Sequence, residues 1–146
     1  MVDESQANNC RGVKRNAFSP LPETAAEGIE FAAGFLPIDA ESRREWRVWI
    51  AFWGRAINDA GLRERHRAYY QEIISRLAAQ LRRPNDAGRA MTLRDARQLA
   101  DAIVAAIDGV GTRAALEADD WPPRRQRETL ARLLGPLLAS LSSAVI

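Results

Sequence analysis

The sequence lacks the residues that most catalytic and metal sites require. Cys10 is its only cysteine and His66 its only histidine, so neither an intrachain disulfide nor a cysteine–histidine zinc cluster can form. The chain contains no HExxH, no GxSxG and no phosphate-binding loop with its lysine, and a lone GxG at Gly109 and Gly111 follows no expected strand. We therefore expect a protein that is not an enzyme and that uses no cofactor and no metal.

Long apolar runs are missing as well. No stretch approaches the ~20 apolar residues of a membrane-spanning helix, and the polar start MVDESQANNCRG lacks the apolar segment of a signal peptide. Charge of one sign does not accumulate either, because the formal net charge is only +2 and most arginines alternate with acidic residues. That alternation is typical of solvated helix faces rather than of a nucleic-acid-binding stripe. We expect a cytoplasmic protein with no membrane partner.

The 146 residues suffice for one domain with a hydrophobic core. Residues 1–20 mix polar types without a period and predict a disordered tail, so we place one helical domain at residues 21–146. Within it, apolar residues recur at helical spacing and show no convincing period-two alternation. We expect an all-α fold of about five helices, at about residues 22–36, 40–57, 62–82, 92–118 and from 123 onward, the last one kinked at Gly135 and Pro136.

Three of the four tryptophans follow one another at helical intervals. Trp46, Trp49 and Trp53 are separated by three and then four residues, which places them on one face of a helix. One interpretation is core packing, which is the commoner role of an aromatic stripe. The other is an effector cavity lined by Trp49, Trp53, Tyr69 and Tyr70, because aromatic faces suit cationic or flat hydrophobic ligands.

Two polar residues interrupt the apolar faces of the following helices. His66 lies on the apolar side of its helix, where it is either packed at a helix interface or in contact with a ligand. Asp108 breaks an apolar run, where an unpaired carboxylate would be costly. It therefore points outward or pairs with Arg113, or it contacts a cationic effector or an arginine across a dimer. Both residues join the candidate ligand-binding set.

The last two expected helices are alanine-rich and leucine-rich in turn. Such faces on adjacent long helices favour a four-helix interface between two copies of the chain, in which small residues let the backbones approach. The alternative is that both faces only close the core of a monomer. The candidate dimer-interface residues are Ala102, Ala106, Gly109, Arg113, Leu130, Leu134, Leu137 and Leu141.

The order of these features is more specific than any one of them. WRVWIAFWGRAIND is followed by GLRERHRAYY, then by LADAIVAAIDGVGTRAAL, a DDWPP turn and ETLARLLGPLL. Over about residues 22–141 this order resembles the C-terminal regulatory domain of TetR-family transcriptional repressors, in particular the BetI type. The most specific segments are WIAFW at residues 49–53 and IDG at residues 107–109.

The resemblance implies a helical bundle that binds a small-molecule effector and forms a homodimer through its last two helices. Family members also carry an N-terminal helix-turn-helix domain that reads DNA, for which we find no counterpart in this sequence. We therefore expect a truncated regulator that does not bind DNA alone and whose partners are itself, an effector and a full-length TetR-family relative. The alternative function is a helical protein-interaction module with no ligand, which a solid interior in place of a cavity would favour.

Overall fold

The computed structural model describes residues 24–84, 88 and 90–143, with side chains described up to residue 139. These residues form five helices and no strand, which confirms the predicted all-α class. The predicted disordered tail at residues 1–20 and the side chain of Leu141 lie outside the described part. The helices are α2 (Ala25–Ala33), α3 (Ala40–Ala56), α4 (Ala60–Leu81), α5 (Leu93–Leu116) and α6 (Pro123–Ser143).

Side-chain caps fix where the helices begin. Asp39 accepts a hydrogen bond from the backbone N–H of Ser42 at 2.8 Å, while the Ser42 hydroxyl accepts one from the Asp39 backbone. Thr24 and Glu27 form the same reciprocal pair at α2. At α4, Asp59 caps the first turn, so this helix begins at Ala60 rather than at the predicted residue 62.

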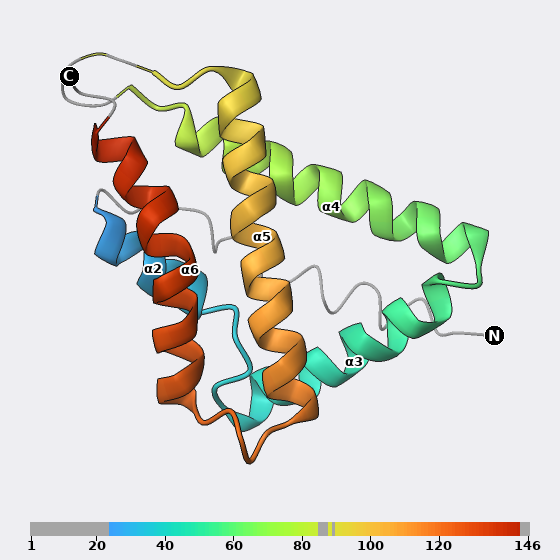
Figure 1. The fold of residues 1–146 in the computed structure, drawn as a ribbon. Coiled ribbons are helices and arrows are strands. Elements are labelled where there is room, and N and C mark those ends of the chain that lie inside the picture. Colours follow the sequence, from blue (N-terminus) through green and yellow to red (C-terminus); the bar gives the residue numbers. More distant parts are fainter. Residues whose placement is uncertain (1–23, 85–87, 89, 144–146) are drawn as a thin grey trace.

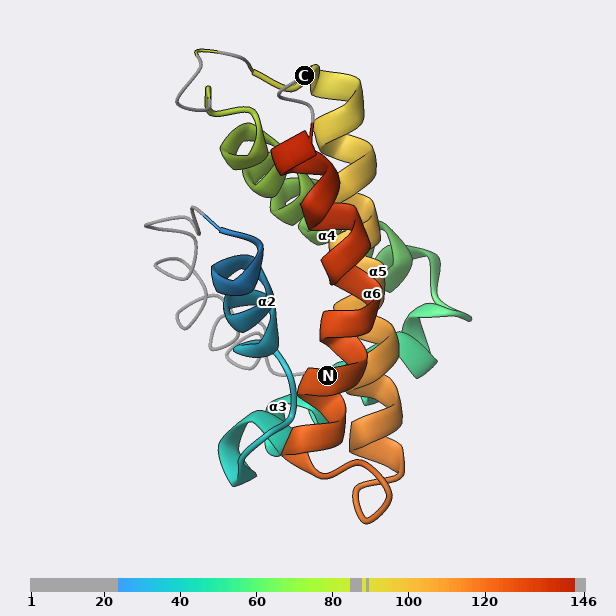
Figure 2. The same cartoon turned by 60° about the vertical axis from the view of Figure 1, so that its left-hand side comes forward.

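Three of the helices form a triangle. In Figure 1, α3 and α4 meet at a sharp corner, and each reaches back to a different part of α5. The helices α5 and α6 run side by side as a hairpin, and α2 packs against α6 (Figure 2). One face of α5 is therefore directed toward α3 and α4, inside the triangle, and another face packs against α6.

The core lies mainly between α2, α5 and α6. Gln126, Leu130, Leu134 and Leu138 follow one another at intervals of four residues on α6, and all four are buried. Gln126 Nε2 donates to the backbone carbonyls of Trp121 and Pro37, at 2.9 and 3.3 Å. Its amide thereby ties the loop after α2 to the turn between α5 and α6.

Two residues that weaken helices lie inside continuous helices. The helix α5 runs unbroken through Gly111, and α6 continues past Pro136. A Cβ at Gly111 would lie inside van der Waals contact of three atoms of the Trp46 indole, so glycine is what allows α3 to approach α5 here. No helix in the described ranges is long and apolar enough to cross a membrane.

Candidate functional site

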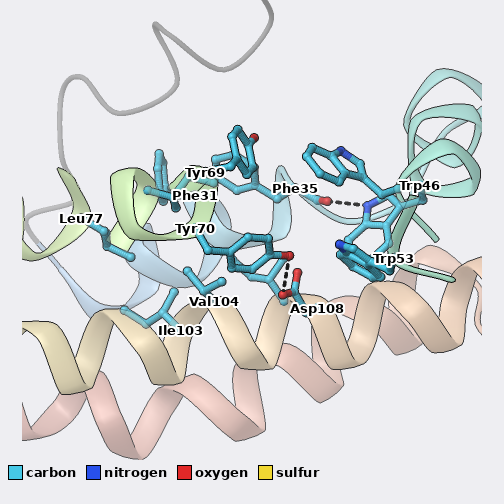
Figure 3. A pocket seen from close by; sticks show the side chains of 13 residues that line it. Phe31, Phe35, Trp46, Trp53, Tyr69, Tyr70, Leu77, Ile103, Val104 and Asp108 are labelled. Atoms are coloured by element: carbon cyan, nitrogen blue, oxygen red, sulfur yellow. Dashed lines mark hydrogen bonds between the residues drawn. The ribbon is translucent and has the colours of Figure 1, made fainter. Parts of the chain in front are cut away.

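A cavity of about 80 Å³ lies inside the triangle of α3, α4 and α5 (Figure 3). It is partly open to solvent, and its lining is mostly apolar and aromatic. The last part of the wall comes from α2 and the residues after it. The lining residues are Phe31, Phe35, Trp46, Trp49, Trp53, Tyr69, Tyr70, Ile73, Leu77, Ile103, Val104, Ile107 and Asp108.

The tryptophan stripe packs the core and lines the cavity at the same time. Trp46 is buried, and its Nε1 donates to the backbone carbonyl of Phe35 at 2.8 Å. Trp53 meets Trp46 edge to face, with ring centroids 5.9 Å apart, and Trp49 lies against Tyr69 at 5.0 Å. Trp46 thus anchors α3 to the rest of the domain, while Trp49 and Trp53 form a wall of the cavity.

The polar end of the cavity is a tyrosine–aspartate pair. The Tyr70 hydroxyl on α4 donates to Asp108 Oδ2 on α5 at 2.8 Å (Figure 3). Burial raises the pKa of the Tyr70 phenol above its ordinary value of 10.0, and the negative charge of Asp108 raises it further. Tyr70 therefore stays protonated and keeps the carboxylate in place. Arg113, which the sequence suggested as an ion-pair partner of Asp108, pairs with Glu117 instead, at 2.8 Å.

The indole nitrogen of Trp53 is a polar atom of the cavity wall. It is buried, and within the part of the chain that the structure describes it finds no hydrogen-bond acceptor. An unmet buried donor costs roughly 1–3 kcal/mol, so its place in a cavity wall marks a position where an acceptor would be favoured. In Figure 3 the Trp53 ring faces Tyr70 and Asp108 across the cavity.

The structure brings five of the six candidate ligand-binding residues together. Trp49, Trp53, Tyr69, Tyr70 and Asp108 all line the cavity, although their role in binding stays a prediction.

The sixth, His66, is not among the lining residues. It lies behind them, stacked on Tyr70 with ring centroids 4.2 Å apart. Sequence reasoning missed the walls that Phe31 and Phe35 supply. Phe31 lies on α2 and Phe35 in the turn that follows it, and no local pattern connects either residue to the tryptophans of α3.

The candidate dimer residues divide into exposed and buried groups. Gly109 and Arg113 are exposed on α5, and Ala102 and Ala106 beside them are partly buried. Gly109 directly follows Asp108 on α5. Asp108 lines the cavity, whereas Gly109 is exposed on the surface. A Cβ at Gly109 would meet no atom of the described residues within 4 Å.

The α6 candidates need a correction. Leu130 and Leu134 have no exposed area, because they pack inside the chain's own core, so a second copy cannot reach them. The exposed leucines of α6 are Leu133, which is 49% exposed, and Leu137, which is 36% exposed. Leu133 was not among the predicted residues, because periodicity alone does not separate the edge of an apolar face from its centre.

Comparison with known protein families gives a match over most of the chain. Residues 29–139 match a family model described as the C-terminal domain of BetI-type transcriptional repressors. The match spans all of α3, α4 and α5 and most of α6, and therefore includes every residue that lines the cavity. Neither the curated proteins nor the solved structures give a match.

Proposed function

The chain belongs to the family of BetI-type transcriptional repressor C-terminal domains, and from this premise we propose that it binds a small organic effector and pairs with a second copy. The effector occupies the aromatic cavity, and the outer faces of α5 and α6 form the pairing surface. A regulatory domain of this kind performs no chemistry on its ligand. Its output is a change in shape or in association.

The cavity is the observation that carries the effector proposal. Its volume of about 80 Å³ is several times the ~10–15 Å³ that one water needs. The lining combines aromatic and aliphatic walls with Asp108 and the Trp53 N–H, which is the usual make-up of a small-molecule site. This hollow interior also favours a ligand-binding domain over a solid interaction module.

Intrinsic fluorescence tests the effector proposal directly, because Trp46, Trp49 and Trp53 line the cavity. Benzyl alcohol, benzylamine and benzyltrimethylammonium serve as probes, and at least one is expected to change the emission with a saturable dose response. Val104→Phe adds a ring to the cavity wall and is expected to abolish that response. Val48→Phe, at a half-exposed position on α3, is the matched control. Unchanged emission with every probe up to its solubility limit would rule out this effector site.

Pairing through α5 and α6 is supported by exposed apolar groups and by Gly109. Leu116 is 68% exposed near the end of α5, and Leu133 and Leu137 add exposed apolar area on α6. Glycine inside a helix costs about 1 kcal/mol relative to alanine, and among the described residues no atom lies within 4 Å of a Cβ added at Gly109. A second backbone that approaches this surface closely would explain why the position carries no side chain.

Two glycine variants separate pairing from simple helix stability. Gly54 is also a helical glycine, and a Cβ added there would meet no described atom within 4 Å, but it lies in the last turn of α3 rather than on α5 or α6. Gly54→Ala is expected to stabilise the chain and to leave its association unchanged. Gly109→Ala is expected to weaken the dimer at least about fivefold, because a methyl group there costs on the order of 1–3 kcal/mol of overpacking. Sedimentation at micromolar concentration measures both, and a purely monomeric wild type would refute the dimer.

The same surface would accept a full-length relative. The family match covers only the C-terminal domain, so a mixed dimer formed through residues 29–139 would draw its DNA-reading domain from the relative, whereas an operator with two half-sites needs two. Addition of the chain to such a relative is therefore expected to reduce its operator complex in a gel-shift titration. Full retention of that complex at excess chain would count against mixed pairing.

A further inference from the structure

Two tryptophans of the cavity wall, Trp46 and Trp53, differ in one respect. Trp46 Nε1 donates to the Phe35 carbonyl, whereas Trp53 Nε1 is buried without an acceptor. Both indoles lie in the same aromatic wall, seven residues apart on α3. The unmet N–H of Trp53 therefore favours a ligand that supplies a hydrogen-bond acceptor at this point.

The opposite side of the cavity offers an acceptor. Asp108 accepts the Tyr70 hydroxyl, and this hydrogen bond holds its carboxylate at the polar end of the cavity. A carboxylate has lone-pair sites for about four hydrogen bonds, so it can hold Tyr70 and still accept from a ligand. Figure 3 shows Trp53 turned toward this pair. A donor without an acceptor and a carboxylate therefore both lie among the residues that line this cavity.

Few functional groups can accept a hydrogen bond from the Trp53 N–H and also donate one to the Asp108 carboxylate. A quaternary ammonium has no N–H to donate and no lone pair to accept. A primary ammonium donates to Asp108 but leaves Trp53 unmet, and a carboxylate accepts from Trp53 but is repelled by Asp108. A hydroxyl group is uncharged, accepts with its lone pairs and donates its proton.

We infer that, within the proposed effector site, the cavity recognises a hydroxyl group on a small apolar body, such as an alcohol or a phenol. The hydroxyl oxygen accepts from Trp53, and its proton is donated to Asp108. Seven of the thirteen lining residues are aromatic, which suits a flat body in offset contact with the walls. The volume of about 80 Å³ lies below the ~150 Å³ of a cavity that binds benzene, so part of a benzyl-sized body must lie in the open mouth.

A series of ligands with one body and different head groups tests this inference. Benzyl alcohol, toluene and benzylamine share a ring and differ in the group presented to Trp53 and Asp108. Isothermal titration calorimetry or ligand-observed NMR on the full chain gives the three dissociation constants near neutral pH. Benzyl alcohol is expected to bind about tenfold or more tightly than either analogue, because each analogue leaves at least one buried polar group unmet.

Two tryptophan variants locate the preference. Trp53→Phe removes the unmet N–H and keeps an aromatic ring, while Asp108 can still accept from the hydroxyl, so the ratio of toluene to benzyl alcohol dissociation constants is expected to fall about threefold or more below that of the wild type. Trp49→Phe is the control, because Trp49 also lines the cavity but its indole nitrogen is not a buried unpaired donor. This variant is expected to keep the ratio of the wild type. Ratios rather than affinities are compared, because both substitutions also enlarge the cavity.

The outcomes distinguish the two proposals. If toluene or benzylamine binds the wild type as tightly as benzyl alcohol, the hydroxyl inference is overturned while the effector site stands. If none of the three binds, the inference fails together with the proposed function. A ratio in Trp53→Phe that is unchanged from the wild type would also overturn the inference, because the Trp53 N–H would then contribute nothing to the preference for the alcohol.

Discussion

Gly111→Ala tests the contact between α3 and α5 on which the cavity depends. Alanine gains about 1 kcal/mol of helix propensity over glycine. Its methyl group, however, would overlap three atoms of the Trp46 indole, which is buried and hydrogen-bonded to Phe35. Overpacking costs about 1–3 kcal/mol, and the strained hydrogen bond adds about 1 kcal/mol. The losses exceed the gain, so we expect a net destabilisation of about 2 kcal/mol.

Urea unfolding measured at a fixed chain concentration gives the free energy, and thermal unfolding gives a second measure. At this chain length, about 2 kcal/mol corresponds to a fall in Tm of roughly 8 °C. Gly54→Ala is the matched control, because its methyl group enters open space and is expected to raise stability. In a double-mutant cycle, Trp46→Phe and Gly111→Ala together should cost less than their sum. A Gly111→Ala protein as stable as Gly54→Ala would refute the reasoning.

Two further perturbations follow from the described contacts. The folded-state pKa of Tyr70 lies above 10.0, so its contribution to stability is complete below pH 10 and is lost as the pH rises. Urea midpoints between about pH 9 and 11 should therefore fall more steeply for the wild type than for Tyr70→Phe, and equal slopes would contradict this. Thr92 caps α5 by accepting from the Asp95 backbone N–H at 3.1 Å. Thr92→Ala should cost about 1 kcal/mol in urea unfolding, and a smaller loss than about 0.3 kcal/mol would show that the cap is dispensable.

The helices were predictable because their signals are local. Asp39 and Thr92 cap α3 and α5 where the sequence indicated helix starts, since a cap acts within three residues. The first helix shows the limit. Its apolar residues suggested a helix to about residue 36, but α2 ends at Ala33, and Phe35 and Leu36 follow in turns. Those residues are apolar because they pack against the rest of the domain, whether or not they are helical.

The candidate site was predictable only in part, for a related reason. Spacing on one helix identifies a face, so Trp49 and Trp53, or Tyr69 and Tyr70, were recognisable as pairs. The spacing does not show whether that face packs against the core, a ligand or a second copy of the chain. Leu130 and Leu134 show this: their face is as apolar as a dimer surface, yet α6 turns it into the core of its own chain.

Through the neighbouring residues Asp108 and Gly109, the helix α5 forms part of both the cavity wall and the proposed pairing surface. One lines the cavity and the next lies on the outer surface, so a rotation or shift of this one helix changes both sides together. In the proposed function, ligand affinity and self-association are then thermodynamically linked. Whatever factor the ligand applies to the dimerisation constant, dimerisation must apply to the ligand's dissociation constant. Occupancy of the cavity would therefore depend on how much of the protein the cell contains.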